Sequence, residues 1–332
     1  MNKSRTYFFS MSTLLLIALL VLYVYDLTLG SVTLGPSELL NGLLGHEKDS
    51  EAELIVQAFR IPRATTAVLA GAGLSVAGLL MQTLFQNPLA GPYVLGINSG
   101  ASMMVALSTM LGASFVGNDL SLVTAALIGA LGAGLFILFC SIYVKNKISL
   151  LLVGVMFGSF AGALVNVIQS YSDPNDLKTF MLWSFGSLQN VAVDQLWIFT
   201  GLVLLGIIMT VFVVKPLDLL VLGERDATIL GVKMRQVRFF IVLITAILTG
   251  VITAFCGPIA FVGLIVPNIV KMLYKTTSHL QLVIGSIIVG ALLIVLCDIA
   301  MQLLSSTIHL PLNSLTALIG APVVVWIIIR KF

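Results

Sequence analysis

The sequence predicts an all-α integral membrane protein with about ten membrane-spanning helices in a single domain over residues 1–332. Of its 332 residues, 59% are hydrophobic and 9% are charged, whereas about a quarter of the residues in a typical soluble domain are charged. Apolar stretches close to the roughly 20 residues that span a bilayer recur along the whole chain. The stretches are continuous, unlike the alternating segments of about ten residues that form the strands of a membrane barrel.

The first expected span, residues 7–29, follows Lys3 and Arg5. It is longer than the apolar core of a signal peptide and has no clear A-x-A cleavage site, so we expect a retained helix. Polar breaks then separate nine further apolar runs. These runs cover residues 62–82, 93–112, 120–143, 149–170, 194–214, 239–256, 258–275, 280–303 and 313–330.

Two of these boundaries contain helix-breaking residues within otherwise apolar sequence. At Cys256-Gly257-Pro258, proline removes a backbone donor and crowds the preceding turn, so we expect two helices rather than one. The stretch Q-N-P-L-A-G-P-Y-V-L-G-I-N-S-G-A-S at 86–102 has two prolines, and Gly91 and Gly96 let its backbone bend closely. Non-helical backbone at membrane depth is tolerated only where it is buried in protein or lines a wet cavity. We therefore expect a tight re-entrant turn at the inner mouth of a pore.

Basic residues predict the orientation of the chain, because cytoplasmic loops are enriched in lysine and arginine. Ten spans place both termini on one side. With cytoplasmic termini, 13 basic residues fall inside and 4 fall outside. The inside residues are Lys3, Arg5, Lys145, Lys147, Lys215, Arg225, Lys233, Arg235, Arg238, Lys271, Lys275, Arg330 and Lys331, and the outside residues are Lys48, Arg60, Arg63 and Lys178.

Two long segments between spans are polar enough to lie outside the bilayer. Residues 30–59 form an outer segment that is charged in its second half. Residues 215–238 form an inner segment of mixed charge, in which we expect a short helix around Gly223 to Leu230 and a break at Gly231. This inner segment is either a solvated connector or a docking surface for a cytoplasmic partner.

The fifth expected span carries small and polar residues on one helical face. Gly154, Gly158 and Gly162 are spaced by four, and Ser159 and Asn166 lie next to them. Small residues let helices approach closely in lipid, and polar side chains must face protein or water. The pattern indicates either packing within the chain or a helix that packs across a subunit interface and lines a conduit.

The sequence gives no indication of an enzyme. No paired carboxylates and no Ser/His/Asp or Cys/His arrangement are recognisable, so we assign no catalytic residue and no metal ligand. His46, His279 and His309 fall in expected loops or at helix ends, and the three cysteines are scattered. The net charge of +3 does not suggest nucleic-acid binding. The phosphate-binding loop G-x-x-x-x-G-K-[ST] is also missing from the sequence, so any ATP and Mg²⁺ would be used by a partner.

Four motifs in order closely resemble the FecCD-type permeases. They are R-I-P-R at 60–63, G-L-L-M-Q-T-L-F-Q-N-P-L-A-G-P-Y-V-L-G-I-N-S-G-A at 78–101, G-P-I-A-F-V-G-L-I-V-P-N at 257–268 and L-P-L-N-S-L-T-A-L-I-G-A-P at 310–322. These permeases are the membrane subunits of ABC importers for iron–siderophores, haem and cobalamin. The resemblance implies the ten-helix fold of the cobalamin-importer permease and a bacterial plasma-membrane location. It also implies a second permease subunit, two cytoplasmic ATPases and a periplasmic or extracellular substrate-binding protein. We expect a homodimer of permeases and an iron–siderophore as cargo, with haem and cobalamin as alternatives.

The resemblance also implies roles for individual residues. Arg60 and Arg63 would meet acidic residues of the binding protein, and Asn87 and Leu89 would form part of the cytoplasmic gate. The residues that would contact the ATPase are Gly223, Glu224, Ala227, Leu230 and Gly231.

The chain departs from the family pattern at three places. Gln302 stands where an outer arginine is usual, and Asn268 stands where a histidine is usual. The turn from Lys145 to Ser149 does not match clearly enough to assign a second gate.

Two other functions remain as alternatives to an ATP-driven importer. An ion-coupled secondary transporter would need polar or charged groups near the bilayer midplane. The expected spans have almost no ionisable residues of this kind, and Asp26 and Asp298 lie towards expected helix ends. A passive channel or scaffold would explain the glycine pattern but not the charged inner segment.

Overall fold

The computed structural model describes residues 2–32, 34–44, 51–110, 121–144, 146–305, 308 and 310–331. Throughout these ranges every regular element is a helix, which confirms the predicted all-α class. Several residues named above lie outside the described ranges, namely His46, Lys48, Lys145 and His309.

Each of the ten expected spans corresponds to a helix. They are α1 (Asn2–Thr28), α4 (Ile61–Phe85), α5 (Ile97–Met110), α6 (Ser121–Tyr143), α7 (Lys147–Ser170), α9 (Val193–Leu220), α11 (Met234–Cys256), α12 (Val262–Tyr274), α13 (His279–Leu304) and α14 (Leu312–Lys331). Seven of the helices in the described ranges are long and apolar enough to cross a membrane. At 1.5 Å per residue the 13 residues of α12 reach only about 20 Å, less than the roughly 30 Å of a hydrocarbon core. Helix α12 is therefore not among these seven helices.

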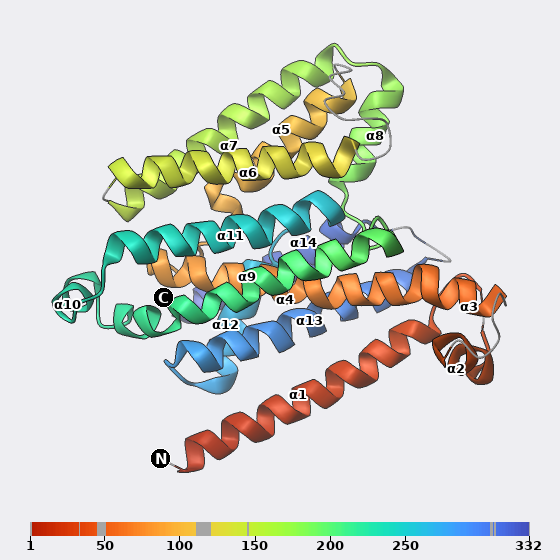
Figure 1. Ribbon diagram of the computed structural model, residues 1–332, viewed down its shortest axis with the longest axis horizontal. Helices are drawn as coiled ribbons and strands as arrows, with labels where there is room; N and C mark the ends of the chain where they lie inside the picture. Colours follow the sequence, from red (N-terminus) through yellow and green to blue (C-terminus); the bar gives the residue numbers. More distant parts are fainter. Residues whose placement is uncertain are drawn as a thin grey trace.

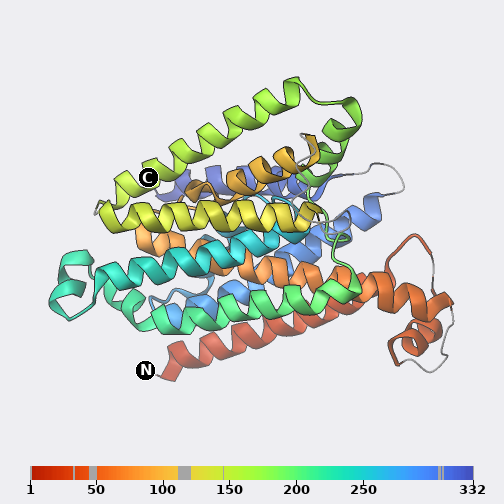
Figure 2. The ribbon, with the colours of Figure 1, turned by 45° about the horizontal axis from the view of Figure 1, so that its top comes forward.

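The helices run roughly along the long axis of the molecule (Figures 1 and 2). The two termini and the short helix α10 (Glu224–Ile229) lie at one end, and the short outer helices α2 (Pro36–Leu44) and α3 (Glu51–Ile55) lie at the other. This arrangement agrees with an even number of crossings. The end that holds α10 is called the inner end below, following the charge distribution, and the opposite end is called the outer end.

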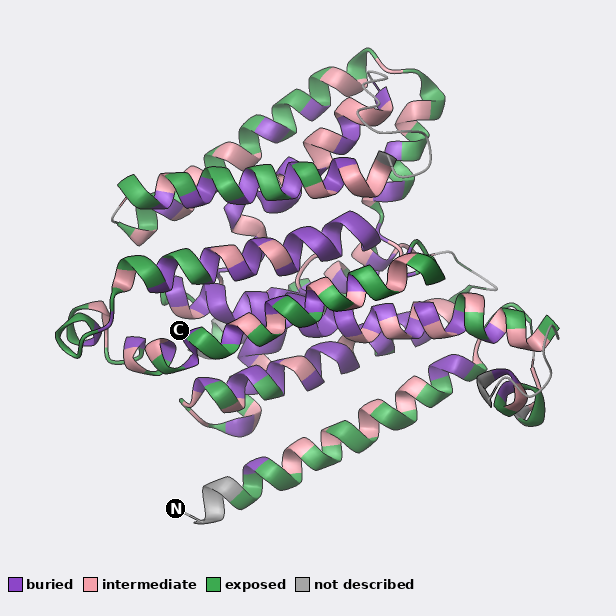
Figure 3. Ribbon diagram, viewed as in Figure 1, coloured by how far each residue is buried: buried purple, intermediate pink, exposed green. Residues whose placement is uncertain are grey.

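Helices α4, α11 and α13 form the buried centre, and α1, α7 and α9 lie at the periphery (Figure 3). Glycines allow the central helices to touch backbone to backbone. A Cβ at Gly71 would overlap the carbonyl of Gly290 on α13, and a Cβ at Gly78 would overlap the carbonyl of Gly263 on α12. In lipid there is little hydrophobic driving force between helices, so close packing of this kind stabilises their association instead.

The inner segment 215–238 is shorter than predicted. Helix α9 continues through Pro216 to Leu220, and α11 already begins at Met234, so only residues 221–233 lie between the two helices. The predicted short helix is present as α10, and Gly231 has the positive φ of 90° expected at a break. The charged residues at the two ends of the segment belong to α9 and α11, because helices can extend past the bilayer.

The break near Pro258 is confirmed, but the following helix starts later than predicted. Helix α11 ends at Cys256, and α12 begins only at Val262. Gly257 and Phe261 both have positive φ, at 75° and 67°. A Cβ at Gly257 would overlap the backbone carbonyl of Trp183, so the chain needs glycine there.

Four short elements were not predicted as helices. Besides α2 and α3, they are the π-helical turn η1 (Val56–Arg60), which leads into α4, and α8 (Pro174–Ser184) at the outer end. A 3₁₀ turn, η2 (Pro92–Leu95), replaces the first part of the predicted span 93–112. Helix α8 had a recognisable start signal, because Asp173 precedes a proline at the first helical position.

Candidate functional site

The inner turn, residues 86–96, is held in a compact shape by its own side chains and by α12. Gln86 ends α4 with a left-handed φ of 48°. The side chain of Asn87 accepts a hydrogen bond from the backbone N–H of Leu89 at 2.9 Å, a contact that closes a tight turn. Asn268 of α12 donates its amide to the carbonyl of Pro88 at 2.9 Å. The predicted helix break is confirmed here, and the gate role of Asn87 and Leu89 stays a prediction.

Beside this turn, four polar side chains from different helices form the inner network: Gln86, Lys147, Glu224 and Arg238. Arg238 donates to Glu224 at 3.2 Å, and its other terminal nitrogen donates to the carbonyl of Val144 at 3.0 Å. Lys147 donates to Gln86 Oε1 at 2.7 Å and lies 3.8 Å from a Glu224 oxygen. The network connects the ends of α4 and α6 with the starts of α7, α10 and α11.

Helix α10 presents apolar residues at the inner end. Gly223 precedes it with a φ of 110°, and Ala227 packs its buried side chain inward. Ile229 is 77% exposed and Leu230 is 57% exposed. Exposed apolar side chains beside charged ones are typical of a protein interface. The five residues assigned to ATPase contact thus lie on α10 or directly beside its ends, and the contact itself stays a prediction.

Arg60 lies at the outer end but is turned into the protein. Only 7% of the residue is exposed, and its guanidinium donates to the backbone carbonyls of Leu27, Thr28 and Val32. It therefore fastens the end of α1 to the start of α4. Sequence reasoning had considered it only as a surface contact.

Arg63 forms a bidentate ion pair with Asp298 of α13. Its nitrogens donate to the two carboxylate oxygens at 2.7–3.0 Å. Gln302 donates its amide to Asp298 at 3.1 Å and to Asp26 of α1 at 2.8 Å. Gln302 thus joins two carboxylates, of which Asp298 also binds Arg63. This buried group stabilises the outer contact between α1, α4 and α13.

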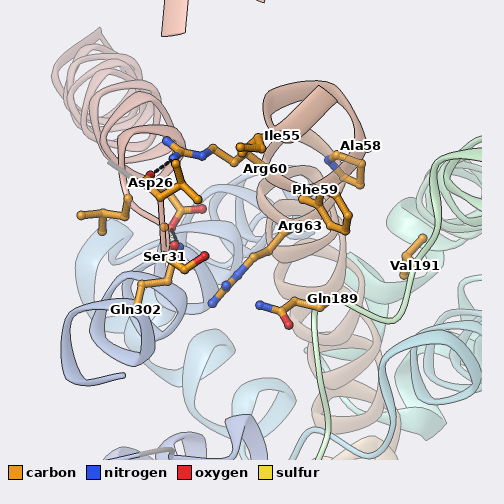
Figure 4. Close-up of a pocket in the computed structure, with 14 residues that line it drawn as sticks. Asp26, Ser31, Ile55, Ala58, Phe59, Arg60, Arg63, Gln189, Val191 and Gln302 are labelled. Atoms are coloured by element: carbon orange, nitrogen blue, oxygen red, sulfur yellow. Dashed lines mark hydrogen bonds between the residues drawn. The ribbon is translucent and has the colours of Figure 1, made fainter. Parts of the chain in front are cut away.

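Two adjoining cavities open beside this group. One has a volume of about 480 Å³ and the other of about 760 Å³, and the residues that line both include Arg63, Gln189 and Gln302. Figure 4 shows Arg63 and Gln189 reaching into the first cavity and Arg60 bonded at its edge. Together these cavities form an outer vestibule, and its mixed polar and apolar walls include Arg63, Gln189 and Gln302.

The glycine face of α7 divides into two parts. A Cβ at Gly154 would overlap the backbone of η2, and a Cβ at Gly158 would lie 3.3 Å from Ser99 of α5. These two glycines therefore pack within the chain. A Cβ at Gly162 would meet nothing within 4 Å, and its neighbours on this face, Ser159 and Asn166, are exposed.

The sequence did not indicate a hydrogen-bonded chain around buried His279 at the inner end. His279 contacts Asp218 through Nδ1 at 2.9 Å and Thr83 through Nε2 at 3.1 Å. It joins α4, α9 and α13. The residues are far apart in sequence, so no local pattern could have shown this contact. Across the described ranges, no group of three or more His, Cys, Asp and Glu residues could hold a metal ion.

Comparison with known proteins decides the identity. The model of the FecCD transport family matches residues 16–330. The chain belongs to the FecCD transport family. This membership confirms the resemblance that the four sequence motifs indicated.

Curated relatives of this FecCD permease include two transport permeases. The haemin transport permease of Yersinia pestis is 34% identical over 321 residues, which cover 96% of each chain. A vitamin B12 import permease of Salmonella arizonae is 32% identical over 330 residues, covering 99% of this chain and 96% of the relative. Among solved structures, an ABC transporter of the metal-chelate type in an inward-facing conformation superposes with a TM-score of 0.85 at 28% identity, over 97% of this chain and 99% of the other.

The FecCD protein is thus a multi-pass permease of the ABC importer class that handles metal chelates, haem and vitamin B12. Its relatives are permease subunits rather than enzymes. The family and the apolar helices indicate the bacterial inner membrane.

Proposed function

We propose that this chain is the permease subunit of an ATP-driven importer that moves an iron complex from a substrate-binding protein into the cytoplasm. The observation that carries the proposal is the similarity to permeases over nearly the full length of the chain, in a sequence that has no phosphate-binding loop of its own. Energy must then come from a separate ATPase, which would bind ATP and Mg²⁺.

The ATPase docks at the inner end on α10. Exposed Ile229 and Leu230 supply apolar contact, and charged Arg225 and Asp226 lie on the same short helix. Movement of the ATPase would reach the inner turn, where Asn87 and Leu89 open or close the conduit. Both termini lie at this end and would be cytoplasmic.

The second permease subunit covers the outward face of α7. Asn166 is exposed on this face, and an amide side chain that faces lipid would leave its polar atoms unsatisfied. Ser159 and Gly162 make the same face small enough for close contact. We propose a homodimer, in which this face of α7 lines the conduit between two copies.

The binding protein docks at the outer vestibule. Arg63 is the better candidate of the two predicted arginines, because it is 19% exposed and lines both cavities, whereas Arg60 is nearly buried. An acidic residue of the binding protein would compete with Asp298 for the guanidinium of Arg63.

The cargo is proposed as an iron–siderophore, with haem and cobalamin as alternatives. The relatives' names support the alternatives, since one is a haemin permease and the other a vitamin B12 permease. Selectivity would reside mainly in the binding protein, because the exposed face of α7 is largely apolar and offers few specific contacts.

Reconstitution tests this proposal. The permease is purified with its co-purifying ATPase and binding protein and placed in liposomes. Uptake of a ferric siderophore, haemin and cyanocobalamin is then measured with and without internal ATP. ATP-dependent uptake of one of these probes supports the proposal. Uptake that follows a proton or sodium gradient in vesicles containing this chain alone would instead establish an ion-coupled secondary transporter.

A further inference from the structure

We infer that Lys147 transmits the position of α10 to the inner turn. The inference deepens the proposed function and rests on it, because it explains how an ATPase bound to α10 would act on the turn that carries Asn87 and Leu89. The sequence alone gave no reason to select Lys147. This residue lies in the turn from Lys145 to Ser149, which does not match the family pattern clearly.

Lys147 is placed between the two elements that it joins. Its ammonium lies 2.7 Å from Gln86 Oε1 and 3.8 Å from Glu224 Oε2. Gln86 is the first residue of the inner turn, and Glu224 is the first residue of α10. In the part of the chain that the structure describes, Lys147 is the one side chain that hydrogen-bonds Gln86 and also forms an ion pair with a residue of α10.

The position of Lys147 itself is fixed by its helix. It is the first residue of α7, and the preceding Asn146 caps that helix by accepting the N–H of Ile148 at 2.8 Å. A capped first turn is more stable than an uncapped one, so the backbone that carries Lys147 is well fixed.

The two partners of Lys147 are each held by a second contact. Gln86 donates its amide nitrogen to the carbonyl of Leu220 at the end of α9, at 3.2 Å. This contact aims the amide oxygen towards Lys147. Glu224 binds buried Arg238 through its other carboxylate oxygen at 3.2 Å. A displacement of α10 therefore moves a carboxylate whose free side faces Lys147.

Of the two ion pairs of Glu224, the one with Lys147 is the adjustable one. It is longer, and the lysine side chain is 24% exposed whereas that of Arg238 is 9% exposed. Water weakens a partly exposed pair, and pairs of this kind shift an equilibrium by up to about fivefold. That range suits a contact that must form and break in each transport cycle.

The test uses a cysteine in place of Leu89 as a reporter, in a Cys140→Ser background that leaves two buried native cysteines. The full complex with its ATPase is placed in lipid nanodiscs, and the rate of maleimide labelling is measured without nucleotide and after trapping with ATP and vanadate. We expect the two rates to differ in the parent complex. Lys147→Met should reduce this difference by about threefold to fivefold, in line with the loss of one partly exposed ion pair.

Two matched variants separate this role from a simple loss of charge. Lys147→Arg keeps both contacts and should retain the parent's difference in labelling. Lys275→Met removes a positive charge from the same end, at an exposed residue that lies outside the inner network, and should also retain it. A Lys147→Met complex with the full nucleotide-dependent difference would overturn the inference.

If Lys147→Met does not assemble, Gln86→Asn decides the question. Asparagine tolerates the left-handed backbone at this position, and its shorter side chain withdraws the amide oxygen from Lys147. We expect the same loss of the labelling difference, and an unchanged difference would overturn the inference. If the parent complex hydrolyses ATP but the labelling rate of the cysteine at position 89 does not change, only the role of Lys147 is refuted. A chain that never assembles with an ATPase refutes the proposed function instead.

Discussion

Asp298→Asn tests the role of the buried ion pair between Arg63 and Asp298 at the outer end. The substitution keeps the shape of the side chain and removes the charge that pairs with Arg63. Breaking a buried ion pair costs about 3–5 kcal/mol. Here Asp298 is fully buried while Arg63 is 19% exposed and lines two cavities. Arg63 can therefore recover water and can turn to nearby Asp26, so we expect a loss of about 2 kcal/mol.

The loss is measured as the change in unfolding free energy in a denaturant titration in a fixed detergent. Asp194→Asn is the matched control, because Asp194 is an exposed carboxylate at the outer start of α9. Its loss should cost less than about 1 kcal/mol, the usual value of a charge at a helix end. A cost for Asp298→Asn no larger than that of the control would refute the argument.

The same variant also tests how the binding protein docks. Without the carboxylate of Asp298, the positive charge of Arg63 is less compensated and more available to a partner at the vestibule. If acidic residues of the binding protein meet Arg63, the affinity for this variant should rise at low salt and the gain should shrink as salt is added. An affinity that does not change would mean that Arg63 serves the permease fold and not docking.

Three further substitutions test the remaining assignments. Arg60→Glu combined with Arg63→Glu should weaken docking of the binding protein by charge repulsion. The affinity is measured by titration at low salt after the folded fraction is checked, and an undiminished affinity would contradict the docking role. Glu224→Arg places like charges within the inner network and should lower ATP-coupled uptake several-fold without loss of membrane insertion; normal uptake in proteoliposomes would remove Glu224 from the coupling assignment. Gly162→Phe should shift the permease towards monomers in a cross-linking assay. Gly201→Phe, at an equally open glycine on α9, is the control and should not. Equal behaviour of the two variants would argue against the α7 interface.

The helical class and the helix order followed from the sequence because both depend on local properties. The apolar runs had nearly the length that a bilayer imposes, and the break at Pro258 depended on a residue that cannot donate a backbone hydrogen bond. The boundaries were less accurate where no membrane constrains the helix, as at the end of α9 and at the start of α11. Helix α8 was missed because its sequence is short and only partly apolar.

The side-chain contacts could not be predicted from the sequence. Arg60 and Arg63 stand three residues apart in one motif, yet one bonds the end of α1 and the other bonds Asp298, 235 positions further along the chain. The charge distribution can indicate on which side of the membrane the two arginines lie, and both were interpreted as outer contacts on that basis. The sequence does not indicate which carbonyls or carboxylates the fold brings to them.

The sequence by itself determined that this protein is a polytopic helical permease of a known family, since composition, run length and four ordered motifs are properties of the chain alone. The tertiary structure decided which polar groups meet: the pairing of Arg63 with Asp298, the chain through His279, and the position of Lys147 between Gln86 and Glu224. The physical reason is that buried polar groups must find partners, and the partners come from whichever helices the close glycine contacts bring together.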